Sequence, residues 1–175
     1  MLGLLVNEPF SPKIAKFGVF IKYTRMKTIF NEADKNEILQ RIEKLTPESK
    51  AVWGKMNVSQ MLAHSAMTTE WPMGGVLVKN SPLQFIGRFF KKSFIYTDKQ
   101  MGKNSPTAPE LITLVDQKEF AKEKAAFINS INKLYNGGEK GITVEKHAFF
   151  GKMTPAEWGI VNYKHADHHL RQFGV

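Results

Sequence analysis

Four segments of the chain combine a helix-start signal with apolar residues at helical spacing, and this repetition limits the fold more than any other feature. The clearest start is Thr154–Glu157, where an N-cap threonine, an N1 proline and an N3 glutamate stand in register. Asn57–Gln60 and Asp116–Glu119 each carry the residues of a capping box. The predicted helices cover roughly residues 32–45, 57–71, 116–136 and 154–173.

Helices of this number and length predict an all-α fold, a four-helix bundle. About a dozen residues separate the first two helices, whereas roughly forty separate the second from the third. A crossover of that length between helices 2 and 3 allows them to run parallel instead of forming a tight hairpin. Strand patterns are scarce, and Gly75–Lys79 and Gly141–Glu145 are the only modest candidates.

The long crossover contains a further amphipathic stretch, Leu83–Ile95, which predicts a short extra helix. Its Arg88, Lys91 and Lys92 lie among phenylalanines and could contact an anionic membrane. Segments of this kind more often pack over the helices or against a partner subunit, and we favour that interpretation.

The composition bounds the chemistry of the chain. A length of 175 residues predicts one domain, and 42% hydrophobic with 23% charged residues excludes wholesale disorder. The chain has no cysteine, which excludes a thiol nucleophile, an iron–sulfur cluster and a Cys-ligated zinc finger. The missing cysteines fit a reducing compartment, and we expect a cytoplasmic protein.

The first residues differ from the rest of the sequence. They lack the pattern of a signal peptide, and no stretch of the chain approaches the ~18 uncharged apolar residues of a membrane span. Met26 opens a stretch that resembles a natural start. We interpret 1–25 as an upstream extension or a mis-assigned start, with an N-terminal strand or docking arm as the alternative, and 26–175 as the domain.

The five histidines are the candidate functional residues: His64, His147, His165, His168 and His169. His165 and His169 stand at i and i+4 on the last helix, so both rings project from one face and can converge on one metal ion. The expected third ligand is His64 from the second helix. The competing interpretation is that these are core histidines bonded to backbone carbonyls.

Several common active sites are excluded. A zincin needs a glutamate directly after its first histidine ligand, and Ala166 stands there. No histidine has the glutamate three residues before it that a di-iron bundle requires. No Gly-rich nucleotide-binding loop and no GxSxG motif occurs. No general base is obvious, and Glu70 and Asp167 are the nearest carboxylates in sequence.

Four motifs resemble those of the DinB-like superfamily, in an uncharacterised branch of unknown function. They are WGKMNVSQMLAH (53–64), KNSPTAP (103–109), HAFFG (147–151) and YKHADHHLRQFG (163–174). The likeness covers about residues 27–175, and the final stretch is its most specific part.

This resemblance implies a bundle in down-up-up-down order, frequently a homodimer, with a divalent metal ion on His64, His165 and His169. Zinc, nickel, manganese or iron would suit imidazole ligands and an open coordination position. Characterised relatives include S-transferases and an isomerase that use low-molecular-weight thiols. Others resemble DNA-damage-inducible proteins without a settled activity.

Further residues accompany the expected triad. His168 could replace a ligand, although the spacing to Gln172 favours His169. Gln172 and Asn162 would support the ligands from behind. His147 would either close the entrance of the site or anchor the loop before the last helix, and we favour the anchor.

Three hypotheses follow, in order of preference. The first is a metal-dependent transferase or hydrolase whose substrate is a small molecule or a low-molecular-weight thiol. The second is a non-catalytic, metal-stabilised protein of stress response or binding. The third is nucleic-acid binding, which rests on the net charge of +9 and on the basic residues of the crossover that have aromatic residues among them. The charges are scattered along the sequence, so nucleic acid is the least favoured partner.

Overall fold

The computed structural model describes residues 25–113 and 116–175. The described chain is mostly helical, with one antiparallel pair of two-residue strands. The helices are α1 (Glu32–Glu43), α2 (Val58–Glu70), α3 (Gln84–Ile95), α4 (Phe120–Gly137) and α5 (Pro155–Gln172), and the strands are β1 (Lys146–His147) and β2 (Gly151–Lys152). The extension proposed for 1–25 lies outside the described residues except for Arg25.

Two of the predicted helix starts are confirmed. Asn57 accepts from the N–H of Gln60 at 2.8 Å, and the Gln60 side chain accepts from the N–H of Asn57 at 3.0 Å. The same reciprocal bonds join Thr154 and Glu157 at the start of α5. These caps satisfy N–H groups that the first turn leaves without helical partners.

The capping box predicted at Asp116–Glu119 is wrong. The carboxylate of Asp116 accepts from the N–H of Lys118, two residues on, at 3.1 Å. A 3₁₀ turn therefore occupies Gln117–Glu119, and α4 begins only at Phe120. Asp116 forms a local turn instead of a helix cap.

Both predicted strands are also corrected. Gly75–Lys79 is not a strand, and the pairing expected within Gly141–Glu145 occurs instead between β1 and β2. The carbonyl of Pro72 accepts from the N–H groups of Thr143 and Val144 at 2.9 and 3.1 Å. This backbone segment is therefore bound to the 3₁₀ turn Trp71–Met73 that follows α2.

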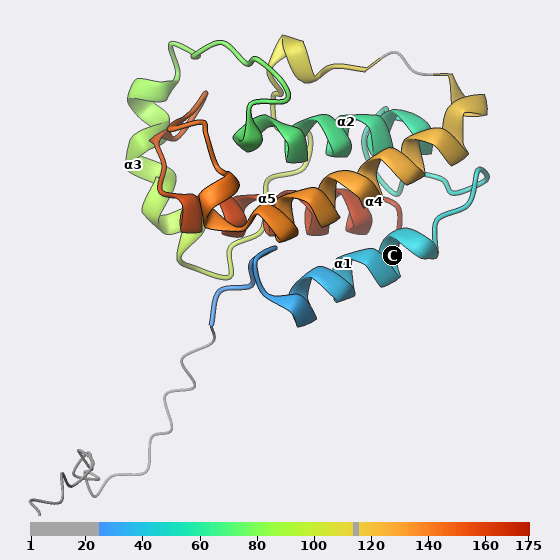
Figure 1. Cartoon of the computed structure of the whole chain (residues 1–175). Coiled ribbons are helices and arrows are strands. Elements are labelled where there is room, and N and C mark those ends of the chain that lie inside the picture. Colours follow the sequence, from blue (N-terminus) through green and yellow to red (C-terminus); the bar gives the residue numbers. More distant parts are fainter. Residues whose placement is uncertain (1–24, 114–115) are drawn as a thin grey trace, which may run out of the picture.

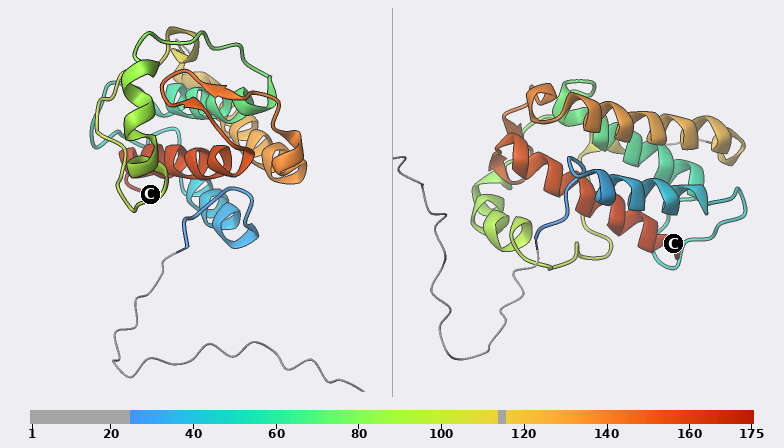
Figure 2. Two further views of the ribbon diagram at one scale, coloured as in Figure 1. Left: turned by 90° about the vertical axis from the view of Figure 1, so that its left-hand side faces the viewer. Right: turned by 60° about the horizontal axis from the view of Figure 1, so that its bottom comes forward.

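Helices α1, α2, α4 and α5 lie side by side (Figure 1). Helices α2 and α4 run in the same direction and pack extensively against each other, while α1 and α5 run the opposite way (Figure 1). Helix α3 lies across one end of this group, beside the β1–β2 hairpin (Figure 2). It is the extra helix that the sequence predicts inside the crossover.

Two apolar clusters hold the helices together. The larger joins α1, α2, α4 and α5 through fully buried side chains: Ile38, Ile42, Met61, Leu62, Phe127, Ile131, Leu134 and Leu170. The smaller lies where α5 begins, among Trp71, Ile95, Leu111, Met153 and Trp158. Helix α5 also buries polar side chains among its apolar ones, including Asn162, His169 and Gln172.

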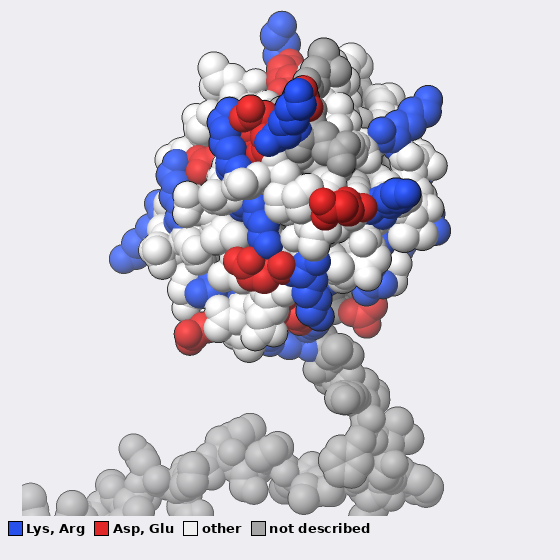
Figure 3. All heavy atoms as spheres, turned by 90° about the vertical axis from the view of Figure 1, so that its right-hand side faces the viewer, with Lys and Arg blue, Asp and Glu red and all other residues white. Residues whose placement is uncertain are grey.

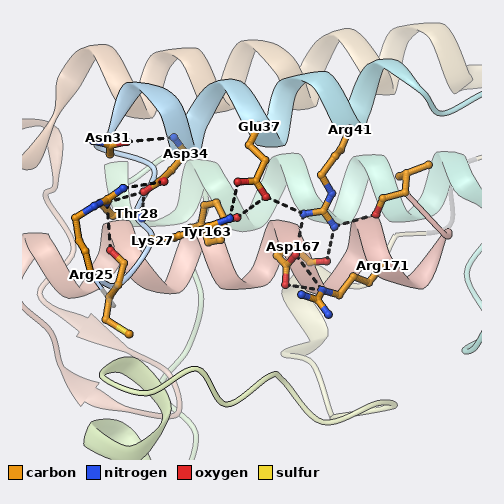
Figure 4. Close-up of polar contacts among 12 residues, drawn as sticks. Arg25, Lys27, Thr28, Asn31, Asp34, Glu37, Arg41, Tyr163, Asp167 and Arg171 are labelled. Carbon is orange, nitrogen blue, oxygen red and sulfur yellow. Dashed lines mark hydrogen bonds and ion pairs between the residues drawn. The ribbon is translucent and has the colours of Figure 1, made fainter. Parts of the chain in front are cut away.

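Charged groups tie α1 to α5 (Figure 4). Arg41 of α1 donates to the carboxylate of Asp167 at 2.7 Å, and Asp167 also pairs with Arg171. The hydroxyl of Tyr163 donates to Glu37 at 3.0 Å. None of the helices within the described residues is long and apolar enough to cross a bilayer.

Candidate metal centre

The three histidines of the predicted triad meet between α2 and α5. Nε2 of His165 lies 3.1 Å from Nε2 of His64 and 3.2 Å from Nε2 of His169. Their candidate ligand atoms all lie within 4.8 Å of one another. The one-turn spacing on α5 brings the rings of His165 and His169 to the same point, and α2 supplies the third ring, that of His64.

The other ring nitrogen of His64 is held by the backbone. Nδ1 lies 2.8 Å from the carbonyl oxygen of Leu111, in the 3₁₀ turn Pro109–Leu111. A carbonyl oxygen can only accept a hydrogen bond, so Nδ1 must carry the proton. The neutral His64 ring therefore presents an unprotonated Nε2 to its neighbours.

The same logic fixes His169 through Gln172. The amide nitrogen of Gln172 donates to the carbonyl of Trp53 at 2.8 Å, which leaves the amide oxygen to face Nδ1 of His169 at 2.9 Å. Nδ1 of His169 is therefore the protonated nitrogen, and its Nε2 also points a lone pair at the cluster. Both anchors preset the tautomer that a metal ligand needs.

Burial keeps these rings neutral. Burial and, to a smaller extent, the neighbouring His64 lower the pKa of His169 to about 3, against the hydrogen bond with Gln172. Burial also holds the pKa of His165 well below its usual value, with His169 and His64 adding to the effect. The pKa of His64 is lowered by burial, although the Leu111 carbonyl opposes the shift. At neutral pH the site is a set of uncharged imidazoles.

This donor set fits a divalent metal ion. Ligand atoms around a tetrahedral ion with Zn–N bonds of ~2.0–2.1 Å lie about 3.3 Å apart, close to the two Nε2 separations. Three His residues so placed could hold such an ion. In the absence of an ion, the Nε2 atom of His165 would have to donate to one neighbour, the arrangement of ordinary core histidines.

His168 does not join the cluster found among residues 25–113 and 116–175. Its half-buried ring makes edge contacts with Trp53 and His169, with ring centroids 5.9 and 5.0 Å away. Asn162 is buried and donates to the carbonyl of Trp158 at 3.0 Å. Its Oδ1 is buried without a hydrogen-bond partner among the described residues.

His147 lies in the smaller apolar cluster instead of the triad. Its ring packs against Trp71 and Trp158, and its Nδ1 accepts from the N–H groups of Phe149 and Phe150 at 3.0 and 3.3 Å. Burial lowers its pKa to about 3. This geometry is that of an anchor for the hairpin before α5.

The two nearby carboxylates are engaged elsewhere. Asp167 binds Arg41 and Arg171, and Glu70 pairs with Lys133 at 2.6 Å. Two carbonyls that support the triad could not be predicted from the sequence. The carbonyl of Leu111 binds His64 directly, and the carbonyl of Trp53 binds Gln172. Both are backbone atoms, and no side-chain pattern identifies them.

A pocket of about 370 Å³ lies near the triad, and none of the three histidines is among its lining residues. Two of its lining residues, Trp53 and His168, connect it to the triad. The carbonyl of Trp53 binds Gln172, and the ring of His168 contacts the ring of His169. Lys103 lies over the Trp53 ring, 4.5 Å from its centroid. The pocket's charged lining is Arg25, Lys27, Lys99, Lys103, Lys164 and Arg171 against Glu37, Asp98 and Asp167.

Comparison with known proteins gives a family and no function. Neither the curated proteins nor the solved structures include a significant match to this chain. One family model covers residues 24–174, almost the whole of the described structure. The chain therefore belongs to a family of proteins of unknown function, DUF1569.

Proposed function

We propose that this protein binds a divalent metal ion through Nε2 of His64, His165 and His169 and uses it in a transferase or hydrolase reaction on a small molecule. The observation that carries the proposal is the anchoring of Nδ1 in two of the rings. Hydrogen bonds to the Leu111 carbonyl and the Gln172 amide oxygen leave the unprotonated Nε2 atoms facing one point.

We also propose that α1, α2, α4 and α5 form a four-helix bundle of down-up-up-down order, related to the DinB-like superfamily. The shared direction of α2 and α4, and the opposite direction of α1 and α5, support this topology (Figure 1). The homodimer and the cytoplasmic location implied by the sequence stay predictions. Sedimentation equilibrium of the purified chain would test the dimer.

The proposed roles follow from the contacts. His64, His165 and His169 would hold the ion, and Gln172 would keep the ring of His169 in its ligand tautomer. A divalent ion in such a site supplies Lewis acidity and lowers the pKa of a bound water or thiol, with zinc, nickel, manganese and iron as candidates. Among the described residues the cluster has three members, which suits a site whose remaining positions serve water or substrate.

The pocket near the triad would receive the substrate. Its excess of cationic over anionic side chains favours a small molecule that carries negative charge, such as an acidic low-molecular-weight thiol. Trp53 would form its apolar wall, with Lys103 stacked on the ring. Burial is the main cause that lowers the pKa of His168, so this residue would offer a neutral ring between the pocket and the triad.

The alternative function is non-catalytic, with the metal ion stabilising a protein of stress response or binding. It would require a fourth protein ligand or an inert site. Nucleic-acid binding ranks last. On the face drawn in Figure 3, basic and acidic side chains are intermixed, whereas a phosphate backbone would be tracked by a basic stripe.

The deciding experiment measures the metal content of the chain purified without chelator or histidine tag. We expect about one divalent ion per chain, lost in His64→Ala and His169→Ala. His168→Ala is the matched control, because it removes a neighbouring imidazole outside the cluster and should retain the ion. A wild-type protein that is metal-free and refuses zinc, nickel, iron and manganese would refute the proposal.

A further inference from the structure

Helix α3 is amphipathic, but most of its apolar side chains point outward. Of its twelve residues only Gly87 and Ile95 are buried. Its outward side chains include Phe85, Ile86, Phe89 and Phe90, exposed by 66, 53, 68 and 54%. A surface helix normally turns its apolar stripe to the core and its polar side to water.

Apolar contacts of Ile95 and Phe94 seat the C-terminal part of α3, and polar side chains hold the rest of it to the protein. Gln84 donates to the carbonyl of His147 at 2.8 Å, and Lys91 donates to Glu157 at 3.0 Å and to the carbonyl of Lys152 at 2.9 Å. These bonds fix the rotation of the helix about its axis. The phenylalanines are therefore held outward by specific contacts on the opposite side, and a contiguous apolar surface of this kind marks an interaction site.

The segment that carries this surface has charges of one sign. Residues 71–97 contain four basic residues and no aspartate or glutamate. Arg88 lies over the rings of Phe85 and Phe89, with its guanidinium carbon 4.4 and 4.8 Å from the two centroids. Exposed Lys92 lies one turn further along the helix. Cations at the edge of an apolar face are typical of helices that lie in a membrane interface.

A basic hollow adjoins the phenylalanines. It measures about 580 Å³ and lies between α3 and the hairpin, with Arg88, Lys91 and Lys152 as its charged lining. Phe85 and Phe150 also border it. Lys91 is bound to Glu157, so a phosphate group would contact Arg88 and Lys152 while the phenylalanines enter the acyl region.

We propose, in place of the interpretation favoured from the sequence alone, that α3 docks this protein on the surface of an anionic lipid bilayer. Phe85, Ile86, Phe89 and Phe90 would insert below the headgroups, and Arg88 and Lys92 would contact lipid phosphates. A second copy of the chain fits this surface less well. A two-fold interface centred on α3 would bring the cations of both copies together, and residues 71–97 supply no carboxylate to pair with them.

Vesicle flotation of the full chain tests the proposal. We expect the chain to float with vesicles of equal parts phosphatidylcholine and phosphatidylglycerol and to stay behind with phosphatidylcholine alone. The variant Phe85→Ser/Phe89→Ser should lose about tenfold in partitioning per phenylalanine. The variant Arg88→Gln/Lys92→Gln should lose roughly fivefold in partitioning per cation, and added salt should also weaken the partitioning of the wild type.

Matched controls separate this surface from general stickiness and charge. Val52→Ser/Ile112→Ser removes two apolar side chains that are equally exposed elsewhere, and Lys50→Gln/Lys118→Gln removes two exposed cations outside residues 71–97. Both controls should float like the wild type. The substituted positions are exposed, so each variant should keep the wild-type fold, and circular dichroism of each variant checks this.

Two results would overturn the proposal. One is a wild-type chain that does not associate with the anionic vesicles at low salt. If sedimentation then shows a dimer that Phe85→Ser/Phe89→Ser dissociates, the surface is a dimer interface instead. The other is flotation that the α3 variants and the control variants reduce to the same extent. Flotation lost in the α3 variants alone supports it.

Discussion

Gln172 donates a hydrogen bond from its amide nitrogen to the backbone carbonyl of Trp53, across 2.8 Å. This bond decides the orientation of the amide, so its oxygen is the atom that faces Nδ1 of His169. The loop before α2 thereby sets the tautomer of a histidine on α5. One side chain links the wall of the pocket to the candidate metal ligands.

The first prediction concerns this link. Gln172→Leu keeps an apolar volume at the position but removes both hydrogen bonds, so Nδ1 of His169 loses its acceptor and the ring its fixed tautomer. We expect zinc affinity, measured by competition titration with a chromogenic chelator, to fall by about 10–100-fold. The exposed neighbour Arg171→Gln serves as control and should change the affinity little. Equal affinities in both variants would show that Gln172 does not support a ligand.

The second prediction concerns removal of the ion. Binding to the folded state alone stabilises a protein, by about 2.7 kcal/mol when the free ligand is at a hundredfold its Kd. We therefore expect a chelator to lower the Tm of the wild type by roughly 5–10 °C. In His165→Ala the chelator should leave the Tm unchanged, because the bridging ring of the triad is missing. A chelator effect of equal size in this variant would place the ion elsewhere.

The third prediction is a pH dependence that arises at His147. Its pKa is lowered by burial to about 3, whereas an unfolded histidine titrates near 6.5. Acid therefore protonates the unfolded chain first. The stability that comes from the neutral ring is fully present above about pH 6.5 and is lost as the pH falls toward 3, by up to ~1.4 kcal/mol per pH unit.

The variant His147→Asn isolates this effect. An asparagine can accept a hydrogen bond from the N–H two residues on, so the turn at Phe149 keeps a partner. The variant should be less stable at pH 7, where the ring's packing against Trp71 and Trp158 is lost. Its free energy of unfolding, measured in urea with chelator present, should fall less steeply between pH 6.5 and 4.5 than that of the wild type. Parallel slopes would contradict the assignment.

Much of the helical fold could be predicted because its signals are local. The boxes at Asn57 and Thr154 need only residues three apart, and both formed as expected. The box at Asp116 failed because the same carboxylate could reach the N–H of Lys118 instead, and sequence does not rank the two bonds.

The site was predicted only in part, for a physical reason. The spacing of His165 and His169 fixes their common face, but two backbone carbonyls hold the ring tautomers. The carbonyl of Leu111 accepts from Nδ1 of His64, and the carbonyl of Trp53 orients the Gln172 amide whose oxygen faces Nδ1 of His169. Any residue has such a carbonyl, so only the fold selects these. The outward orientation of the apolar face of α3 could not be predicted from the sequence either. Periodicity predicts an amphipathic helix, whereas the partners that turn it outward come from distant segments.

The last prediction tests the close approach that seats α3. A Cβ on Gly87 would overlap the carbonyl oxygen of Phe149 and lie 2.8 Å from its carbonyl carbon. These are backbone atoms and cannot rotate away. At an exposed helix position, Gly→Ala stabilises by up to about 1 kcal/mol through helix propensity. We expect Gly87→Ala to reverse that sign and cost about 1–3 kcal/mol, because α3 or the hairpin must shift.

Urea unfolding of Gly87→Ala beside Ser93→Ala measures this cost. Ser93 is exposed on the same helix, so its replacement should change stability by no more than about 0.5 kcal/mol. Limited proteolysis should also cut Gly87→Ala faster than Ser93→Ala within residues 80–100, since a displaced α3 loses the bonds from Gln84 and Lys91. A Gly87→Ala protein more stable than the wild type would mean that α3 is not held against the hairpin as the structure has it. The outward orientation of its phenylalanines would then lose its cause.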